Sequence, residues 1–194
     1  SIKDSSYDQI KLTIIQLGLD DLFTFKVSPL EIICNQNGNK FIARGCDDAT
    51  KLKSIKDYSA VWYEEEIPEE DDFITITTSI RTSRAKYLQE IFTINPEVEG
   101  KFQDNWFWLK FFEPNMHEKS FSVDKTIHLE DGTPIQLKHT AHHSSYRDNR
   151  WLKNEMKAYL QNLKKDNPYY YEIYGEGNWG NRVVGGLAYK KFIR

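Results

Sequence analysis

The sequence has few of the features that mark secreted, membrane or fibrous proteins. Only two of its 194 residues are cysteines, Cys34 and Cys46, and their spacing matches no metal-binding motif. Two thiols make no disulfide framework, so a reduced, cytoplasmic setting is the default expectation. No apolar run approaches the roughly 20 residues that a membrane-spanning helix needs. Repeats and low-complexity tracts are also absent, which leaves a globular α, β or mixed protein.

The chain also lacks an excess of charge of either sign. Its 26 basic and 29 acidic residues give a net charge of −3. This balance argues against a protein that coats nucleic acid, because such proteins are usually basic. It remains compatible with a local basic patch.

The first part of the chain alternates helical and strand patterns. Apolar side chains at helical spacing predict a helix over Tyr7–Leu19. Ser28–Ile33 and Lys40–Arg44 are predicted strands, and the Asn-rich turn of residues 35–39 would join them as a hairpin. The segment 51–55 is a candidate helical turn.

Two short apolar runs predict buried strands in the middle of the chain. We expect Ala60–Tyr63 and Leu88–Ile94 to be adjacent parallel strands of one sheet, since continuous apolar runs are typical of parallel strands. Between them, the β-branched residues of Phe73–Ile80 favour a strand by local propensity. A helix is the competing prediction, because Phe73, Ile76 and Ile80 fall on one helical face.

The second half predicts a short aromatic helix, a hairpin and a long helix. The helix covers Trp106–Phe112, and Asp131-Gly132 is the hairpin turn between apolar strands, the second of which continues to Ser144. Asn149 is a candidate cap of the long helix, which ends at Asn167-Pro168. Strands interleaved with helices favour an α/β class with a mostly parallel sheet flanked by helices.

The strand Ala60–Tyr63 runs directly into two acids, Glu64 and Glu65. A buried strand holds such acids at its carboxyl end, where open α/β sheets bind ligands. The first acid suits a hydrated Mg²⁺, and the second suits orienting or deprotonating a water. A solvated acidic loop is the open alternative, because seven of the nine residues from Glu64 to Asp72 are acidic. The third acid, Glu66, leaves the register open by one residue.

Polar residues also end the next predicted strand, at Phe92–Pro96. A hydroxyl or amide there, from Thr93 or Asn95, can sense a terminal phosphate or position a water without adding charge. The alternative is that Asn95-Pro96 only begins a turn.

Basic residues and histidines offer weaker candidates. Arg81 and Arg84, with Lys51 and Lys53, are possible contacts to DNA or to a phosphate, although side chains that are solvated or paired with nearby acids are the commoner explanation. The histidines at positions 139, 142 and 143 could suggest a zinc site, but ordinary surface histidines are the favoured interpretation, since zinc needs three or four ligands in tetrahedral geometry.

Together with the polar ends of the two predicted strands, three further segments make five motifs along the chain. The three segments are Arg44–Ile55, His143–Asn149 and Gly175–Gly180. In their order and spacing the five segments resemble the large terminase subunits of tailed phages and prophages. Members of that family have an arginine-glycine-aspartate-lysine-serine segment, a tryptophan-tyrosine-glutamate-glutamate strand and a strand ending in asparagine-proline. A serine/threonine-tyrosine-x-aspartate-asparagine segment and a glycine-x-tryptophan-glycine follow. The resemblance covers about Ser5 to Ala188.

The resemblance implies a P-loop ATPase of the additional-strand glutamate type that drives double-stranded DNA into a procapsid. By position, Glu64 would hold Mg²⁺ through water, Glu65 would be the catalytic glutamate, and Thr93 and Asn95 would form the coupling motif. ATP and Mg²⁺ are the implied cofactors. The implied partners are the portal protein, the terminase small subunit and further copies in a ring. The implied place of action is the host cytoplasm, transiently at the portal vertex of the procapsid, with no membrane.

The chain departs from the family in lacking any Gly-x-x-x-x-Gly-Lys-Ser/Thr loop. We therefore expect residues 1–180 to be an incomplete ATPase domain without its Walker A region. Residues 181–194 would be an exit segment toward an absent nuclease domain. Two alternatives stay open: a non-catalytic interaction or DNA-binding module, and a metal-dependent nuclease that uses the acids of Glu64–Asp72.

The missing loop generates a prediction for the 194-residue chain by itself. We expect no measurable ATPase activity, because the loop supplies the lysine and the backbone amides that cradle the phosphates. Phosphate release by the purified chain is the measurement. Robust turnover that is lost in Glu65→Gln would contradict the prediction.

Overall fold

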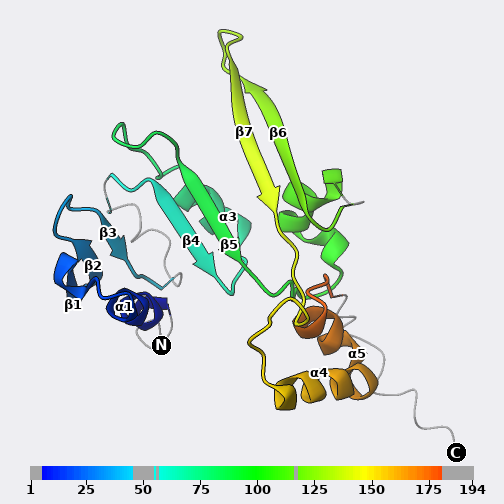
Figure 1. Ribbon diagram of the computed structural model, residues 1–194. Coiled ribbons are helices and arrows are strands. Elements are labelled where there is room, and N and C mark those ends of the chain that lie inside the picture. Colours follow the sequence, from blue (N-terminus) through cyan, green and yellow to red (C-terminus); the bar gives the residue numbers. More distant parts are fainter. Residues whose placement is uncertain (1–5, 46–54, 56, 116–117, 181–194) are drawn as a thin grey trace, which may run out of the picture. The chain divides into compact units, whose positions relative to one another are not determined.

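The computed structural model describes residues 6–45, 55, 57–115 and 118–180. The chain divides into two compact units, Ser1–Thr93 and Ile94–Arg194. Each unit has its own strands and helices (Figure 1). In the described part of the chain, no helix is long and apolar enough to cross a membrane.

The first unit begins with a helix and an antiparallel sheet. Helix α1 (Ser6–Gln16) and the short helix η2 (Asp20–Leu22) precede β1 (Phe23–Val27), β2 (Leu30–Cys34) and β3 (Lys40–Ile42). The order is β1-β2-β3, and both pairs are antiparallel. Tyr7, Ile14 and Ile32 form the buried core of this part. The predicted helix and hairpin are confirmed, whereas β1 was not predicted.

The rest of the first unit is a βαβ arrangement. Strand β4 (Ala60–Glu64) leads into α3 (Glu70–Thr77), which leads into β5 (Gln89–Thr93). The two strands pair in parallel, as predicted, in the register that places Ala60 beside Gln89 and Glu64 beside Thr93. The prediction that both strands are buried is wrong, because Trp62 and Ile91, on the face away from α3, are 44% and 39% exposed. Helix α3 lies behind the pair in Figure 1.

Helix α3 corrects the strand predicted from local propensity for Phe73–Ile80. Phe73 and Ile76 are only 4% and 1% exposed, whereas Ile74 is 45% exposed. Tyr63, from β4, stacks on Phe92, from β5, with ring centroids 4.4 Å apart, and Phe73 lies 6.5 Å from Tyr63. Burial of apolar residues at helical spacing therefore outweighs the strand propensity of the β-branched residues. A helix also suits this position, because two parallel neighbouring strands need a crossover connection between them.

A long hairpin and an aromatic cluster open the second unit. Strands β6 (Phe121–His128) and β7 (Pro134–Ala141) pair antiparallel around the predicted Asp131-Gly132 turn, and the second strand ends at Ala141 rather than Ser144. The short helices η3 (Phe102–Asp104), η4 (Trp108–Phe112) and η5 (Glu113–Asn115) precede the hairpin, and η4 is a π-helix. Rings from η3 and η4 form a cluster with Phe121 and Trp179.

The second unit continues with α4 (Asn154–Asp166), α5 (Pro168–Tyr170) and the π-helix η6 (Tyr171–Gly175). The predicted cap at Asn149 is wrong, because α4 begins later and its N-cap is Lys153, without a side-chain cap bond. The Asn149 side chain instead accepts a hydrogen bond from the Trp151 amide at 3.0 Å, which makes a local turn.

The expected α/β class is confirmed as a mixed α/β fold, but the sheet is not mostly parallel. Among the described strands, β4 with β5 is the one parallel pair, and the pairs β1–β2, β2–β3 and β6–β7 are antiparallel. Short turns, such as residues 35–39 and Asp131-Gly132, join antiparallel neighbours directly, which is why hairpins predominate.

The α3 face of the β4–β5 pair generates a stability prediction. Phe73→Ala should lower the free energy of unfolding by about 3–5 kcal/mol, because it empties a packed aromatic site. Ile74→Ala, one residue further along the helix and half exposed, should cost about 1 kcal/mol or less. Urea unfolding of both variants measures the difference. Equal losses would show that Phe73 is not part of the core.

Candidate functional site

The carboxyl ends of β4 and β5 bring two predicted site residues together. Glu64 and Thr93 are register partners at the ends of the two strands. One residue later, the backbone amide of Glu65 donates a hydrogen bond of 2.7 Å to the Thr93 carbonyl oxygen. Glu64, Glu65 and Thr93 therefore occupy the edge at which parallel sheets bind their ligands.

Glu65 has a backbone conformation that is uncommon for its residue type. Its φ angle is +61°, in the left-handed region. A side chain with a Cβ atom pays a steric cost there, and such residues concentrate at functional sites. The turn ends the extended course of β4, so the Glu65 side chain departs from the alternation that places Tyr63 and Glu64 on opposite faces.

Trp62 also belongs to this end of the sheet, which sequence reasoning missed. Its indole Nε1–H donates a hydrogen bond of 2.8 Å to the Thr93 hydroxyl. The Thr93 hydroxyl donates a long hydrogen bond of 3.5 Å to the Tyr63 carbonyl oxygen. Trp62 belongs to the tryptophan-tyrosine-glutamate-glutamate segment, but no spacing rule links residues 62 and 93.

The last four acids of the run have a structural explanation. Glu70, Asp71 and Asp72 lie in the first turn of α3, and Glu69 is its N-cap residue. Carboxylates at a helix N-terminus are stabilised by the helix dipole. The four later acids therefore stabilise the start of α3, whereas Glu64 and Glu65 lie at the end of β4. In the residues that the structure describes, no three His, Cys, Asp or Glu side chains converge on a possible metal position.

The basic candidates lie elsewhere. Arg81 and Arg84 are exposed and belong to the loop that precedes β5, at the amino ends of the parallel strands. Topology therefore separates them from Glu64 and Glu65. Lys51 and Lys53, and with them the candidate helical turn 51–55 apart from Ile55, lie outside the described residues. Asn95 is exposed and belongs to the second unit, where its carbonyl accepts a 2.7 Å hydrogen bond from the Glu97 amide.

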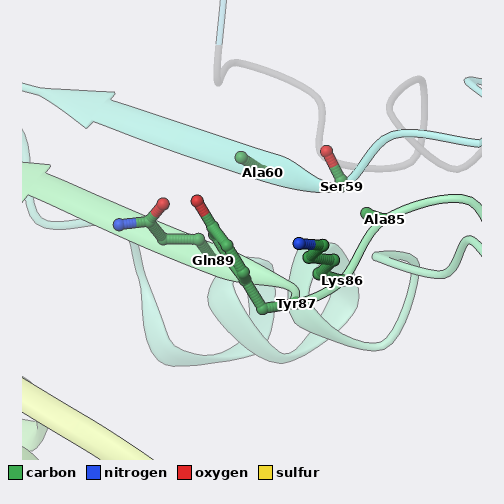
Figure 2. A pocket seen from close by; sticks show the side chains of 6 residues that line it. All are labelled: Ser59, Ala60, Ala85, Lys86, Tyr87 and Gln89. Carbon is green, nitrogen blue, oxygen red and sulfur yellow. The ribbon is translucent and has the colours of Figure 1, made fainter.

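An open depression of about 320 Å³ lies at the amino ends of the same strands. Figure 2 shows its lining: Ser59, Ala60, Ala85, Lys86, Tyr87 and Gln89. It is at the opposite end of the strands from Glu64 and Thr93, so it is not a site at which those residues act.

In the second unit, two of the recognised segments meet through an ion pair. Arg147 donates two hydrogen bonds to the Glu176 carboxylate, at 2.6 and 2.7 Å, and a third to the Tyr171 hydroxyl at 2.9 Å. The Tyr171 hydroxyl in turn donates to Glu176. Tyr171 is 3% exposed, so the network connects a buried hydroxyl to a bidentate surface pair.

Backbone contacts join the same two segments. The Tyr146 amide donates a 2.9 Å hydrogen bond to the Gly175 carbonyl oxygen. Gly177 has a φ of +66°, and a Cβ atom there would fall 2.3 Å from the Ser144 carbonyl oxygen. Only glycine combines that backbone conformation with so close an approach. The segment His143–Asn149 and the segment Gly175–Gly180 are thus one structural feature.

The ion pair changes the acid–base behaviour of its members. Hydrogen bonds from Arg147 and Tyr171 lower the pKa of Glu176 from 4.5 to about 2. Its hydrogen bond to Glu176 raises the pKa of Arg147 above its ordinary value, so the guanidinium stays charged. Nearby, Tyr174 donates to the Glu97 carboxylate, which raises the pKa of Tyr174 to about 12.

The structure thus defines a class of mixed α/β proteins in which a βαβ unit carries acids at the carboxyl end of its sheet. Comparison with known proteins adds the family. A family model described as phage terminase large subunit matches residues 1–178. The PBSX phage terminase large subunit of Bacillus subtilis (strain 168) is 30% identical over 180 residues, which are 92% of this chain and 40% of that relative. The chain belongs to the phage terminase large subunit family, which confirms the resemblance. It spans 40% of the length of this curated relative.

The low pKa of Glu176 predicts a pH dependence of stability. Between about pH 4.5 and pH 2 the unfolded chain binds the proton of this carboxyl while the folded chain does not. Stability from the pair is therefore fully present above about pH 4.5 and is lost as the pH falls toward 2. Glu176→Gln should lower the Tm at pH 7 and reduce its further fall on acidification.

Thermal unfolding across this pH range is the measurement. Glu130→Gln, at an exposed carboxylate near the hairpin turn, is the matched control and should keep the acid dependence of the unaltered chain. An unchanged acid slope in Glu176→Gln would rule out a contribution from the pair.

Proposed function

We propose that this chain is part of a DNA-packaging motor that hydrolyses ATP to move double-stranded DNA into a procapsid. One observation carries the proposal: Glu64 and Glu65 stand at the carboxyl end of β4, beside Thr93 on the adjacent parallel strand. Membership of the terminase large subunit family supports the same function. ATP-driven translocation belongs to the whole protein, of which such a site is one component.

In this proposal Glu64 is the acid on the magnesium side. Mg²⁺ prefers carboxylate and water oxygens, and Glu64 is a half-buried carboxylate at a rigid strand end. These features suit a carboxylate that holds the hydration shell of the ion. When bound, Mg²⁺ would neutralise phosphate charge.

Glu65 is the proposed catalytic glutamate. It is exposed at the strand end, and its left-handed backbone turns it away from the course of β4. A carboxylate in this position can orient a water and accept its proton. Thr93 ends the next strand, β5, and Asn95 follows it by two residues. The two residues form the proposed coupling motif.

The residues of this chain suit ATP only in part. No segment has the Gly-x-x-x-x-Gly-Lys-Ser/Thr pattern whose amides and lysine cradle phosphates. We propose that the phosphate loop and the nuclease domain belong to other parts of the whole protein. A P-loop core of the additional-strand glutamate type would then be completed by a segment that lies outside these 194 residues.

The partners in this proposal are double-stranded DNA, the portal protein, the terminase small subunit and further copies in a ring. The motor would act in the host cell at the portal vertex of the procapsid. Arg81 and Arg84 are exposed and remain candidates for phosphate contacts with DNA or with a neighbouring subunit. The nuclease alternative is less well supported, because four of the acids it needs lie around the first turn of α3.

The decisive experiment substitutes the three consecutive acids in the whole protein. Glu65→Gln should lower turnover by about 10²–10⁴, the usual contribution of a general base, and should spare nucleotide binding. Glu64→Gln should weaken Mg²⁺-dependent binding, because a neutral amide replaces a carboxylate that holds the metal's water.

Glu66→Gln is the matched control and should be nearly silent, since Glu66 lies two residues beyond the end of β4. ATP binding and phosphate release are measured for all three variants. Loss of turnover in Glu66→Gln, with only metal binding affected in Glu65→Gln, would shift the assignment by one residue. Full activity of all three would refute the catalytic assignment.

A further inference from the structure

The hydrogen bond between Trp62 and Thr93 is not needed to satisfy a buried group. Trp62 is 44% exposed, so water could accept from its indole N–H at little cost. The register partner of Trp62 is Ile91, and Thr93 lies two residues further along β5. The indole therefore reaches diagonally toward the carboxyl end of the sheet, a distance that aromatic side chains span. It meets the Thr93 hydroxyl at 2.8 Å.

The chemistry of the two groups determines the direction of the bond. An indole Nε1–H can only donate, whereas a threonine hydroxyl can donate once and accept twice. Thr93 must therefore accept from Trp62, and its own proton is directed elsewhere. Its acceptor among the described residues is the Tyr63 carbonyl oxygen at 3.5 Å. That distance is well beyond the roughly 2.7–2.8 Å of an ordinary O–H···O bond.

The backbone of Thr93 is held as well. Its carbonyl oxygen accepts the 2.7 Å hydrogen bond from the Glu65 amide. Thr93 is thus fixed at its backbone by one candidate acid residue and at its side chain by Trp62. The Thr93 side chain is therefore already oriented, and its proton makes only a long, weak hydrogen bond. Such a hydroxyl can donate to an anionic oxygen without first changing its rotamer.

We propose that Trp62 is a positioning residue that makes the Thr93 hydroxyl a hydrogen-bond donor toward a phosphate oxygen at the carboxyl ends of β4 and β5. This role rests on the proposed ATPase function and names how one group of that site is oriented. Trp62 does not touch the nucleotide in this arrangement. It acts through Thr93, on the face of the sheet opposite α3.

The first test is kinetic and uses the whole protein. Trp62→Phe and Thr93→Val should each lower kcat about 2- to 10-fold, the amount expected for one neutral hydrogen bond. The KM for ATP should change little. Thr93→Ser keeps the hydroxyl and should retain most of the activity. The double variant Trp62→Phe with Thr93→Val should be no slower than Thr93→Val alone, because both changes remove the same interaction.

Two controls distinguish loss of the Trp62 hydrogen bond from loss of apolar packing around it. Ile91→Ala removes apolar surface from the same face, beside Trp62, and should leave kcat unchanged. Replacement of Trp62 by benzothienylalanine keeps the ring shape but puts sulfur in place of the N–H, and should slow turnover as much as Trp62→Phe.

The second test is spectroscopic and independent of activity. In protein labelled with ¹⁵N at the indoles, Thr93→Val should shift the Trp62 N–H resonance and speed its exchange with water. The resonance of Trp151, which is 78% exposed, should not move.

Each result bears on the proposal in one direction. Wild-type kcat in Trp62→Phe, losses that multiply in the double variant, or an unmoved Trp62 resonance in Thr93→Val would each overturn the positioning role. Glu65→Gln reports separately on the proposed function. If Glu65→Gln stays active, the ATPase site itself is wrongly assigned. If Glu65→Gln is inactive and Trp62→Phe is not impaired, only the role of Trp62 fails.

Discussion

The parallel pairing of β4 with β5, in the register that sets Glu64 beside Thr93, is the constraint on which the candidate site depends. A slip of one residue would move every side chain of β5 to the other face. Phe92 would then lose its stacking on Tyr63, and Thr93 would leave the face that Trp62 occupies. The aromatic packing against α3 therefore maintains the register, and the register assembles the acids and the hydroxyl.

In the second unit, side-chain and backbone contacts, rather than strand pairing, bring distant segments together. Two segments separated by more than twenty residues are joined by a bidentate ion pair, a buried tyrosine hydroxyl and a glycine that permits close backbone approach. The energy of an exposed salt bridge is small, but geometry of this kind adds specificity. Motifs recognised as separate in the sequence are here parts of one contact.

Much of the local structure follows from the sequence because its causes are local. Helical spacing predicts α1, an Asn-rich turn predicts the β2–β3 hairpin, and Asp131-Gly132 predicts the β6–β7 turn. Where the cause is tertiary, local reasoning is wrong. Phe73–Ile80 has strand propensity yet contributes to a helix, and Asn149 makes a turn rather than a cap. The assignments of Glu64, Glu65 and Thr93 to catalytic roles stay predictions, although the structure brings these residues together.

The sequence by itself determined the family, the two strands that run into polar residues, and the identity of the acids that follow the first of them. Composition, periodicity and motif order are properties of neighbours along the chain, and they are sufficient for these conclusions. Only the tertiary structure decided that β4 and β5 are the one parallel pair among the described strands, that Trp62 donates to Thr93, and that Arg147 pairs with Glu176. Each of these rests on register, side-chain direction or close packing between residues far apart in sequence, for which the linear order of residues provides no measure of distance.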